Sequence, residues 1–312
     1  ELVFDGGSFV LNCQAQVVCR LPQFEEVMDI VSYDGDFHAG PVIPVASPEQ
    51  QVYEALVLGV KDYIRKNGFP GAIIGLSGGV DSALVLAIAV DALGPENVRC
   101  VMMPSLYTAE ISLIDARDMD QRLGVRYDEK SIAPMFDAFL QTLASDFDAM
   151  PLDATEENIQ ARVRGTLLMA LSNKLGAIVL TTGNKSEMAT GYCTLYGDMA
   201  GGFAVIKDVA KTLVYQLAQW RNQHDPYGSG VSPIPVRIRQ LPGFHSREPE
   251  SPDLHPLGTH ELVFRRLRRG LCELLGLLSQ CLALRGKHIQ RDTLSVQGQP
   301  SDMSEDHSRR LQ

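Results

Sequence analysis

Residues 73–82 read Ile-Ile-Gly-Leu-Ser-Gly-Gly-Val-Asp-Ser, a short apolar run that leads into a glycine-rich turn and the start of a helix. The two adjacent glycines, Gly78 and Gly79, let the backbone turn sharply with its N–H groups facing outward. The helix that follows offers the positive end of its dipole to an anion. Ser77 and Ser82 add hydroxyl donors. We expect this turn to bind phosphate.

Two common nucleotide motifs are excluded by residue type. The Lys-Ser/Thr ending of the Walker loop and the spaced glycines of the dinucleotide fingerprint are both missing. Asp81 stands where the Walker loop would carry a cation. A carboxylate beside a phosphate is useful if it holds a divalent metal that neutralises both groups. The alternative is an ordinary strand-to-helix turn in which Asp81 only caps the helix.

The complete Ser-Gly-Gly-Val-Asp-Ser string after an apolar strand is more specific than a bare Gly-Gly turn. It resembles the signature of the PP-loop ATP pyrophosphatases, the adenine nucleotide α-hydrolase-like fold. That resemblance implies an enzyme that splits ATP between the α- and β-phosphates in order to adenylylate a substrate.

The composition describes a protein that can bury a large core. The 312 residues are 45% hydrophobic, which allows one large domain or two. No apolar run of membrane-spanning length occurs, so we expect no membrane association. The sequence starts at Glu1 without a methionine or a charged-then-apolar leader, so we expect no signal peptide and an incomplete N-terminus. The six cysteines form no C-x-x-C pair, which favours a reduced, cytoplasmic compartment.

The formal net charge of −10 is distributed unevenly. Residues 1–231 carry a net charge of −13, whereas residues 232–312 carry +3. The negative charge of residues 1–231 argues against a nucleic-acid-binding surface. The positive charges of residues 232–312 are too widely spread along the sequence to indicate one. We therefore expect no nucleic-acid partner.

Strand and helix patterns alternate through the middle of the chain. Strands are expected at 71–77, 98–104, 125–130 and 177–182. Helices are expected after Pro48 and at 83–93, 108–123, 132–147, 155–174 and 208–222. This alternation predicts an α/β fold with a doubly wound parallel sheet, whose ligands gather at the carboxyl ends of the strands.

The N-terminal residues suggest a second domain. Residues 1–26 predict two short strands, and two strands cannot stand alone. The strings at 4–8 and 21–26 resemble the last strands of a nitrilase-type amidase domain, although an edge hairpin of the main domain is the alternative. We therefore expect an amidase remnant at 1–33, a linker at 34–48, a PP-loop domain at 49–230 and an atypical tail at 231–312.

The helix expected at 155–174 opens with Thr155 as its cap. Its apolar stripe leaves Asn158 and Arg162 one turn apart on another face. A solvated polar face is the usual explanation for such a pair. Two segments that follow favour a functional role for the pair instead. Residues 181–192 read Thr-Thr-Gly-Asn-Lys-Ser-Glu-Met-Ala-Thr-Gly-Tyr, and residues 195–203 read Leu-Tyr-Gly-Asp-Met-Ala-Gly-Gly-Phe.

With these strings in order, the chain from about residue 48 to residue 230 resembles the glutamine-dependent NAD(+) synthetases. The family adenylylates the nicotinate carboxylate of deamido-NAD with ATP and Mg²⁺, and ammonia then displaces AMP to give the amide. A nitrilase-like glutaminase domain supplies the ammonia from glutamine. The resemblance also implies at least a homodimer.

The resemblance implies a role for several residues. Asp81 would be catalytic and a magnesium ligand, and Glu187 would serve the metal or the dinucleotide. Asn158 and Arg162 would meet deamido-NAD. Thr182 would contact ATP, and Lys207 would be a catalytic cation directed at its phosphates. The remaining ATP contacts would come from Gly75, Leu76, Ser77, Gly78, Gly79, Val80, Asp81 and Ser82.

Two alternatives stay open. Another PP-loop amidotransferase or ligase, such as a GMP synthetase, would share residues 73–82 but not 184–202. A catalytically inactive fragment could retain only ATP or dimer contacts. From residue 231 onward the family's closing strings are absent, which suggests a shifted reading frame or a divergent tail. We expect residues 232–312 to be largely disordered or loosely helical.

Overall fold

The computed structural model describes residues 2–148, 150–228 and 230–239. The sequence-based expectations for residues 240–312 therefore lie outside the described residues. Two helices differ from expectation, and the parallel sheet contains the four expected strands and a fifth, β7, that the sequence analysis did not expect.

The central sheet is parallel throughout, with strand order β5-β4-β3-β6-β7. Its strands are β3 (Ala72–Gly75), β4 (Val98–Met102), β5 (Arg126–Glu129), β6 (Ile178–Thr181) and β7 (Phe203–Ala204). The chain builds outward from β3 to β4 and β5 on one side, and then adds β6 and β7 on the other. The order therefore reverses between β3 and β6, which confirms the doubly wound fold and marks where a ligand crevice opens.

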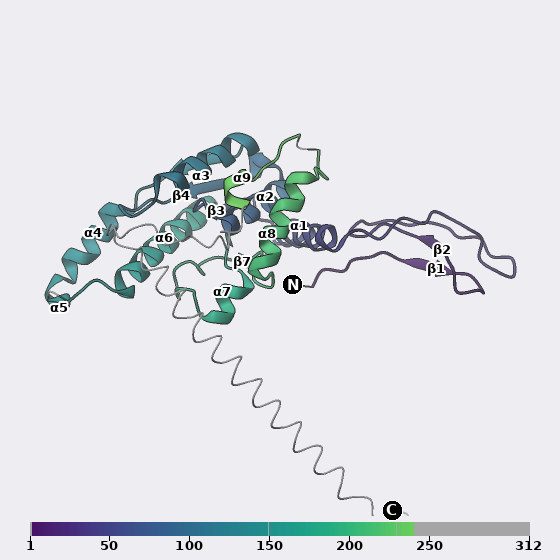
Figure 1. Cartoon of the computed structure of the whole chain (residues 1–312), viewed down its shortest axis with the longest axis horizontal. Helices are drawn as coiled ribbons and strands as arrows, with labels where there is room; N and C mark the ends of the chain where they lie inside the picture. The colour runs from purple at the N-terminus through teal and green to yellow at the C-terminus, as the bar shows by residue number, and fades with distance from the viewer. Residues whose placement is uncertain (1, 149, 229, 240–312) are drawn as a thin grey trace, which may run out of the picture. The chain divides into compact units, whose positions relative to one another are not determined.

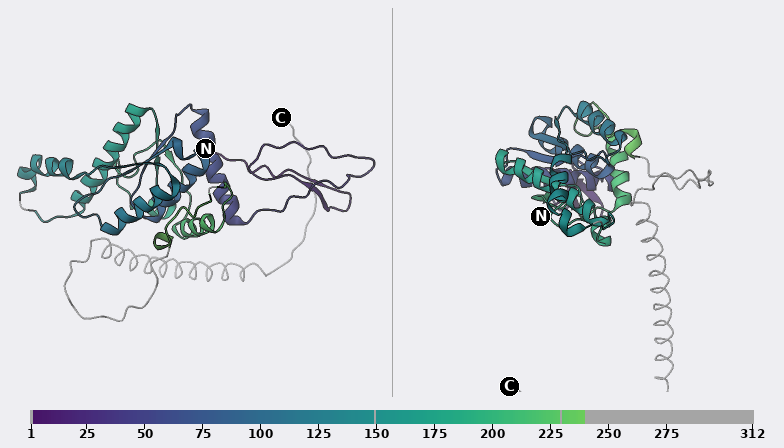
Figure 2. Two further views of the ribbon diagram at one scale, coloured as in Figure 1. Left: turned by 90° about the horizontal axis from the view of Figure 1, so that it is seen from above. Right: turned by 90° about the vertical axis from the view of Figure 1, so that its left-hand side faces the viewer.

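Helices cover both faces of this sheet (Figures 1 and 2). They are α1 (Pro48–Lys66), α2 (Val80–Leu93), α3 (Glu110–Leu123), α4 (Ala133–Thr142), α5 (Ala144–Phe147), α6 (Ala154–Leu175), α7 (Lys185–Thr190), α8 (Lys211–Gln223) and α9 (Val236–Arg239), with a 3₁₀ turn at Pro95–Asn97. The larger apolar cluster joins the sheet to α1, α2, α3 and α8, and a smaller cluster joins it to α4 and α6.

Strand β3 shows how the two clusters are separated. Ala72 and Ile74 belong to the larger cluster, whereas Ile73 belongs to the smaller one, because successive side chains point to opposite faces. All three are essentially inaccessible to solvent. Helix α2 is buried almost all round, as its apolar sequence predicts. A buried α2 holds the glycine-rich turn rigidly against the sheet.

The helix expected at 155–174 begins one residue earlier, and its cap differs from expectation. Asp153, not Thr155, is the N-cap: its carboxylate accepts from the Thr155 amide at 2.7 Å. The Glu156 carboxylate reaches back to the Asp153 amide at 2.9 Å. This reciprocal capping box satisfies two amides that a threonine cap would leave to solvent. The expected helix 132–147 is divided near Leu143 into α4 and α5.

The C-terminal limit of the packed domain lies beyond Gly230. Ile234 has no exposed surface, and Ile238 on α9 is 8% exposed, so both belong to the larger core cluster. The Asn222 side chain accepts from the Ile234 amide at 3.0 Å and donates to the Ile234 carbonyl at 2.6 Å. The packing therefore continues for several residues past the point where the sequence resemblance was expected to end.

The N-terminal strands form a separate antiparallel sheet of β1 (Phe9–Leu11) and β2 (Val17–Arg20), with a bulge between Val10 and Leu11. In the described residues this pair shares no strand pairing with the parallel sheet. Within the same described part, no helix combines the length and apolar character that crossing a bilayer requires.

Candidate active site

The glycine-rich turn has the tight geometry that its sequence predicts. Gly78 has φ 79°, and a Cβ there would lie 2.5 Å from the Ser112 carbonyl oxygen, so only glycine fits. The Ser77 and Ser82 hydroxyls lie 3.0 Å apart, and Ser82 Oγ also accepts from the Ser77 amide at 3.2 Å. Ser82 is almost fully buried. Its hydroxyl therefore braces the turn from inside.

Asp81, in the first turn of α2, is held by two side chains from distant parts of the chain. The Asn184 side-chain amide donates to Asp81 Oδ1 at 2.9 Å. The Lys211 ammonium, at the first residue of α8, forms an ion pair with Asp81 Oδ2. The Asp81 side chain is 16% exposed and that of Lys211 is 37% exposed. The fold thus brings an acid, an amide and a cation together at the end of the glycine-rich turn.

Glu187 lies next to this group through the start of α7. Asn184 caps α7 by accepting from the amides of Ser186 and Glu187, and Glu187 Oε2 accepts from the Asn184 amide at 3.1 Å. Burial raises the pKa of Glu187, and the negative charges of Asp81 and Asp198 raise it further. Glu187 therefore interacts electrostatically with both of these acids, and Asn184 bridges two of the predicted site residues.

The acids suit magnesium in their chemistry. Mg²⁺ takes hard oxygen ligands and commonly uses only one or two carboxylates, with waters and substrate phosphates completing its shell. Asp81 and Glu187 offer such carboxylate oxygens beside the glycine-rich turn. In the described residues no group of three or more His, Cys, Asp and Glu side chains could enclose a metal. The arrangement fits a metal that is shared with a phosphate ligand.

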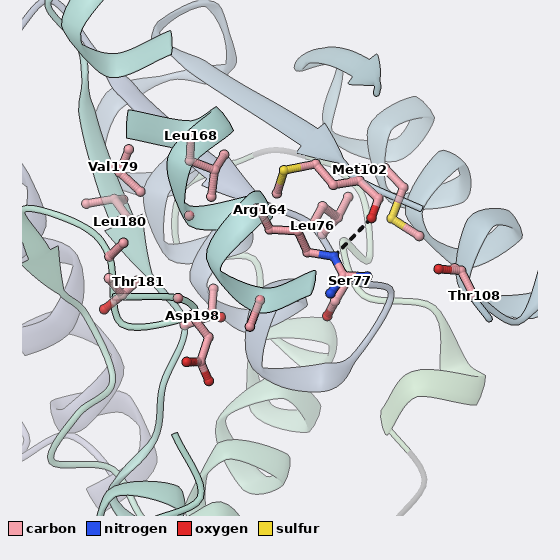
Figure 3. Close-up of a pocket in the computed structure, with 17 residues that line it drawn as sticks. Leu76, Ser77, Met102, Thr108, Arg164, Leu168, Val179, Leu180, Thr181 and Asp198 are labelled. Carbon is pink, nitrogen blue, oxygen red and sulfur yellow. Dashed lines mark hydrogen bonds between the residues drawn. The ribbon is translucent and has the colours of Figure 1, made fainter. Parts of the chain in front are cut away.

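A cavity of about 340 Å³ opens at the switch point between β3 and β6. Its wall includes Gly75, Leu76 and Ser77 after β3, and Thr181 and Thr182 at the end of β6. Apolar side chains from three elements supply much of the remaining wall: Met102, Met103, Leu168, Val179 and Leu180 (Figure 3). The loop at 197–200 and α6 complete it.

Two polar groups in this wall were not singled out from the sequence. Arg164 reaches from α6 to donate through Nε to the Met103 carbonyl at 3.1 Å, and burial lowers its pKa (Figure 3). Thr181 Oγ1 is buried and has no hydrogen-bond partner among the described residues. An unpaired buried hydroxyl costs free energy, so it favours a ligand that can bond to it.

Asn158 and Arg162 lie apart from the cavity wall. Asn158 Oδ1 accepts from the Thr194 hydroxyl at 2.8 Å, and the exposed Arg162 donates to the Leu195 carbonyl at 3.3 Å. Both side chains therefore tie the loop after α7 to α6. Gly165 on α6 also allows this loop to approach the helix closely, because a Cβ at Gly165 would lie 2.7 Å from the Gly197 carbonyl oxygen.

Lys207 is exposed in the turn between β7 and α8. The cation that contacts Asp81 is Lys211, four residues later, which the sequence reading did not select. The sequence did contain an indication of its role. A lysine at the first position of a helix is unfavourable beside the positive end of the helix dipole, so its presence there indicates a nearby anion. Arg164 had a comparable signal, since it stands between the buried residues Val163 and Gly165.

The sheet order, the switch-point cavity and the glycine-rich turn define a nucleotide-binding α/β domain of the PP-loop type. The family model described as NAD synthase matches residues 52–260. The chain belongs to the NAD synthase family. This match ends thirty residues beyond Gly230, where the sequence analysis placed the end of the PP-loop domain.

Glutamine-dependent NAD(+) synthetases are among the similar proteins. The glutamine-dependent NAD(+) synthetase of Acinetobacter baylyi is 46% identical over 266 residues, which are 84% of this chain and 48% of that protein. The structure of the glutamine-dependent NAD+ synthetase from Acinetobacter baumannii, in complex with ADP, has a TM-score of 0.74 and 48% identity, and the match covers 78% of this chain and 47% of that one.

A shorter type of enzyme also matches. The structure of the NH3-dependent NAD synthetase from Campylobacter jejuni has a TM-score of 0.53 and 31% identity, over 58% of this chain and 76% of that one. The present chain spans about half the length of the curated relatives it matches.

Proposed function

We propose that this chain carries the synthetase activity of a glutamine-dependent NAD(+) synthetase. It would amidate deamido-NAD to NAD with ATP, through an adenylylated intermediate, and release AMP and diphosphate. The observation that carries the proposal is the meeting of Asp81, Glu187 and Lys211 beside the glycine-rich turn. Membership of the NAD synthase family supports the same reaction over that of a GMP synthetase.

ATP would lie between the cavity and the turn. The cavity is largely apolar and suits the adenine ring, while Arg164 and the Thr181 hydroxyl, which has no partner in the described part of the chain, would provide polar contacts. The triphosphate would follow Gly75 to Ser82 toward the positive end of the α2 dipole. Thr182, at the cavity wall between these regions, would contact the nucleotide, as proposed from the sequence.

Adenylylation brings two anions together, the nicotinate carboxylate and the triphosphate of ATP. A nicotinate carboxylate oxygen would attack the α-phosphorus, and the bond to the bridging oxygen would break so that diphosphate leaves with the electron pair. Lys211 and the α2 dipole would stabilise the charge on the departing diphosphate. Asp81 and Glu187 would hold Mg²⁺, which supplies positive charge to the phosphates when bound.

The second step would transfer the acyl group. Ammonia would attack the acyl carbon of the adenylate, and AMP would leave as the carbon–oxygen bond breaks. Asn158 and Arg162 would bind deamido-NAD through the loop that they tie to α6. Lys207, exposed ahead of α8, would reach the ATP phosphates from outside the Asp81 pair. Both assignments follow the family resemblance.

The remaining assignments concern the rest of the protein. We propose that residues 1–33 are the end of a nitrilase-like amidase domain and 34–48 a linker, since a two-stranded sheet is marginal alone. Phe9 on β1 is 60% exposed, as expected of a strand that belongs to a larger sheet. Such a domain would supply ammonia from glutamine. The full-length enzyme would be a cytoplasmic homo-oligomer, without nucleic-acid or membrane partners.

Isotope tracing separates the proposal from its alternatives. The purified chain is incubated with deamido-NAD, ATP, Mg²⁺ and ¹⁵N-ammonium, and the NAD formed is analysed by mass spectrometry. We expect ¹⁵N-labelled NAD with ammonium and none with amide-labelled glutamine. Amidation of xanthosine monophosphate instead of deamido-NAD would favour a GMP synthetase. No amidation of either substrate would identify an inactive fragment.

A further inference from the structure

Helices α2 and α8 pack against each other and run in the same direction, because an ion pair joins their starts and another joins their ends. Near their starts, Asp81 pairs with Lys211, and near their ends, Asp91 pairs with Arg221. Both pairs join residues that are 130 positions apart in the chain. The two pairs are therefore equally spaced on both helices, about 15 Å apart along each axis.

The second pair is far more buried than the first. The side chains of Arg221 and Asp91 are 0% and 3% exposed. Arg221 Nε contacts Asp91 Oδ2 at 2.7 Å and Nη2 contacts Oδ1 at 3.0 Å, the planar two-point geometry that only arginine offers a carboxylate. The Tyr53 hydroxyl, from α1, donates to Asp91 Oδ2 at 2.6 Å. We call Tyr53, Asp91 and Arg221 the clasp.

The end of α8 is fixed by further contacts of the same arginine. Arg221 Nη1 donates to the His224 carbonyl at 3.1 Å, and Nη2 lies 3.4 Å from the Asp225 carboxylate. Trp220 packs 5.2 Å from the Tyr53 ring and stacks on His224. The clasp thus joins α1, α2 and α8, and Arg221 also contacts the loop after α8.

A buried ion pair is weak evidence for stability, because the cost of removing both charges from water can exceed their attraction. Its best attested role is to specify register, since any sliding of one helix would leave a buried charge unpaired. A slide of one residue along α8 would move Lys211 by about 1.5 Å relative to Asp81. The register of α8 on α2 therefore connects the clasp at one end of the helices to the Asp81–Lys211 pair at the other.

We propose that the clasp is a positioning device for the proposed reaction: Asp91 and Arg221 set the register of α8 on α2 and so place Lys211 at Asp81. This rests on the proposed function, but it assigns a role to residues that contact neither the cavity nor the glycine-rich turn. Arg221 is a positioning residue that acts through Lys211.

The first test measures Lys211 itself and needs no turnover. Lysines are labelled briefly with acetic anhydride, and the extent of modification at each is read by mass spectrometry. We expect Arg221→Lys, which keeps the charge but loses the two-point contact, to raise Lys211 labelling several-fold. Lys174 on α6 should not change. Tyr53→Phe, which removes only one hydrogen bond, should produce a smaller rise and serves if Arg221→Lys does not fold.

The matched control is Arg99→Lys. Arg99 pairs with Asp128 at 2.6 Å between β4 and β5, and the two side chains are 13% and 24% exposed. This variant should lower the melting temperature without exposing Lys211. Melting temperature and the fluorescence of Trp220, the one tryptophan of the chain, report folding. If Arg221→Lys destabilises the protein and leaves Lys211 labelling unchanged, the clasp is only structural and the proposal is overturned.

The second test is a double-mutant cycle on diphosphate release. We expect Arg221→Lys to slow release roughly tenfold, because small displacements of positioned groups are costly. In a Lys211→Met background the same change should cost nothing further, whereas a purely structural effect would remain additive. If the wild-type chain releases no diphosphate, the proposed function fails, and the labelling experiment still decides the role of the clasp.

Discussion

The side chain of Asn184 serves two residues at once: its amide donates to Asp81 Oδ1 at 2.9 Å, and its carbonyl oxygen accepts from the Glu187 amide at 3.0 Å. It is completely buried. One side chain therefore couples the acid at the start of α2 to the acid in the first turn of α7. The relative placement of the two proposed magnesium ligands depends on it.

Replacing Asn184 by Ala should affect the reaction more than the fold. Loss of an N-cap costs about 1 kcal/mol of stability. The variant also frees Asp81 and Glu187 from their common partner, so diphosphate release should fall at least tenfold. The matched control is Ser47→Ala, which removes the cap of α1, where Ser47 Oγ accepts from the Gln50 amide at 3.2 Å. Similar activity losses in both variants would contradict the role of Asn184.

The substitution Asp81→Asn should abolish metal-dependent diphosphate release and leave the fold intact. Asparagine keeps the size of aspartate and an oxygen that can accept from the Asn184 side-chain amide, but it brings no charge for Mg²⁺ or for Lys211. Magnesium titrations of diphosphate release should show no saturable response. Asp118→Asn on α3, which breaks an exposed pair with Arg122, is the control and should retain activity. Unchanged activity in Asp81→Asn would remove Asp81 from the site.

The substitution Arg162→Ala should weaken deamido-NAD binding more than ATP binding. Arg162 is exposed and ties the loop after α7 to α6 through the Leu195 carbonyl, whereas the proposed ATP cavity contains Arg164 instead. Dissociation constants for both ligands, measured by calorimetry, test this directly. Equal weakening of both ligands would argue that the loop serves the whole site and that Arg162 has no preferred substrate.

The substitution Ile234→Ala should lower the free energy of unfolding by about 2–5 kcal/mol, the cost of removing a buried isoleucine. Ile234 is fully inaccessible to solvent and lies past the domain end expected from the sequence. Val236→Ala, at a position that is 58% exposed on α9, should change stability little. Urea denaturation measures both variants. Equal, small effects would restore a domain boundary near Gly230.

Thiol labelling at pH 8 should distinguish the cysteines by burial. Burial raises the pKa of Cys100 to about 12, so only about one molecule in 10⁴ carries its thiolate at that pH. Exposed Cys193 should react with an aromatic disulfide reagent in the native protein, and Cys100 only after unfolding. Peptide mapping identifies the modified residues. Rapid native labelling of Cys100 would show that the core opens far more readily than this packing allows.

Much of the fold could be predicted because its determinants are local. The apolar run before Gly78, the helix patterns on either side of it and their strict alternation define a doubly wound sheet without reference to any long-range contact. The position of the ligand crevice follows from the same alternation, because the carboxyl ends of parallel strands share one edge. The helix start at Asp153 was misread as Thr155, because both residue types make good caps and only the geometry selects one.

The sequence by itself determined the glycine-rich turn, the fold class and the family, and it proposed the acids Asp81 and Glu187 as site residues. Tertiary structure alone decided which groups meet them. Lys207 and Lys211 are equivalent by residue type, yet Lys211 contacts Asp81, because α8 packs against α2 in one register across 130 residues of chain. That register depends on buried contacts such as Asp91 with Arg221, which no local pattern encodes.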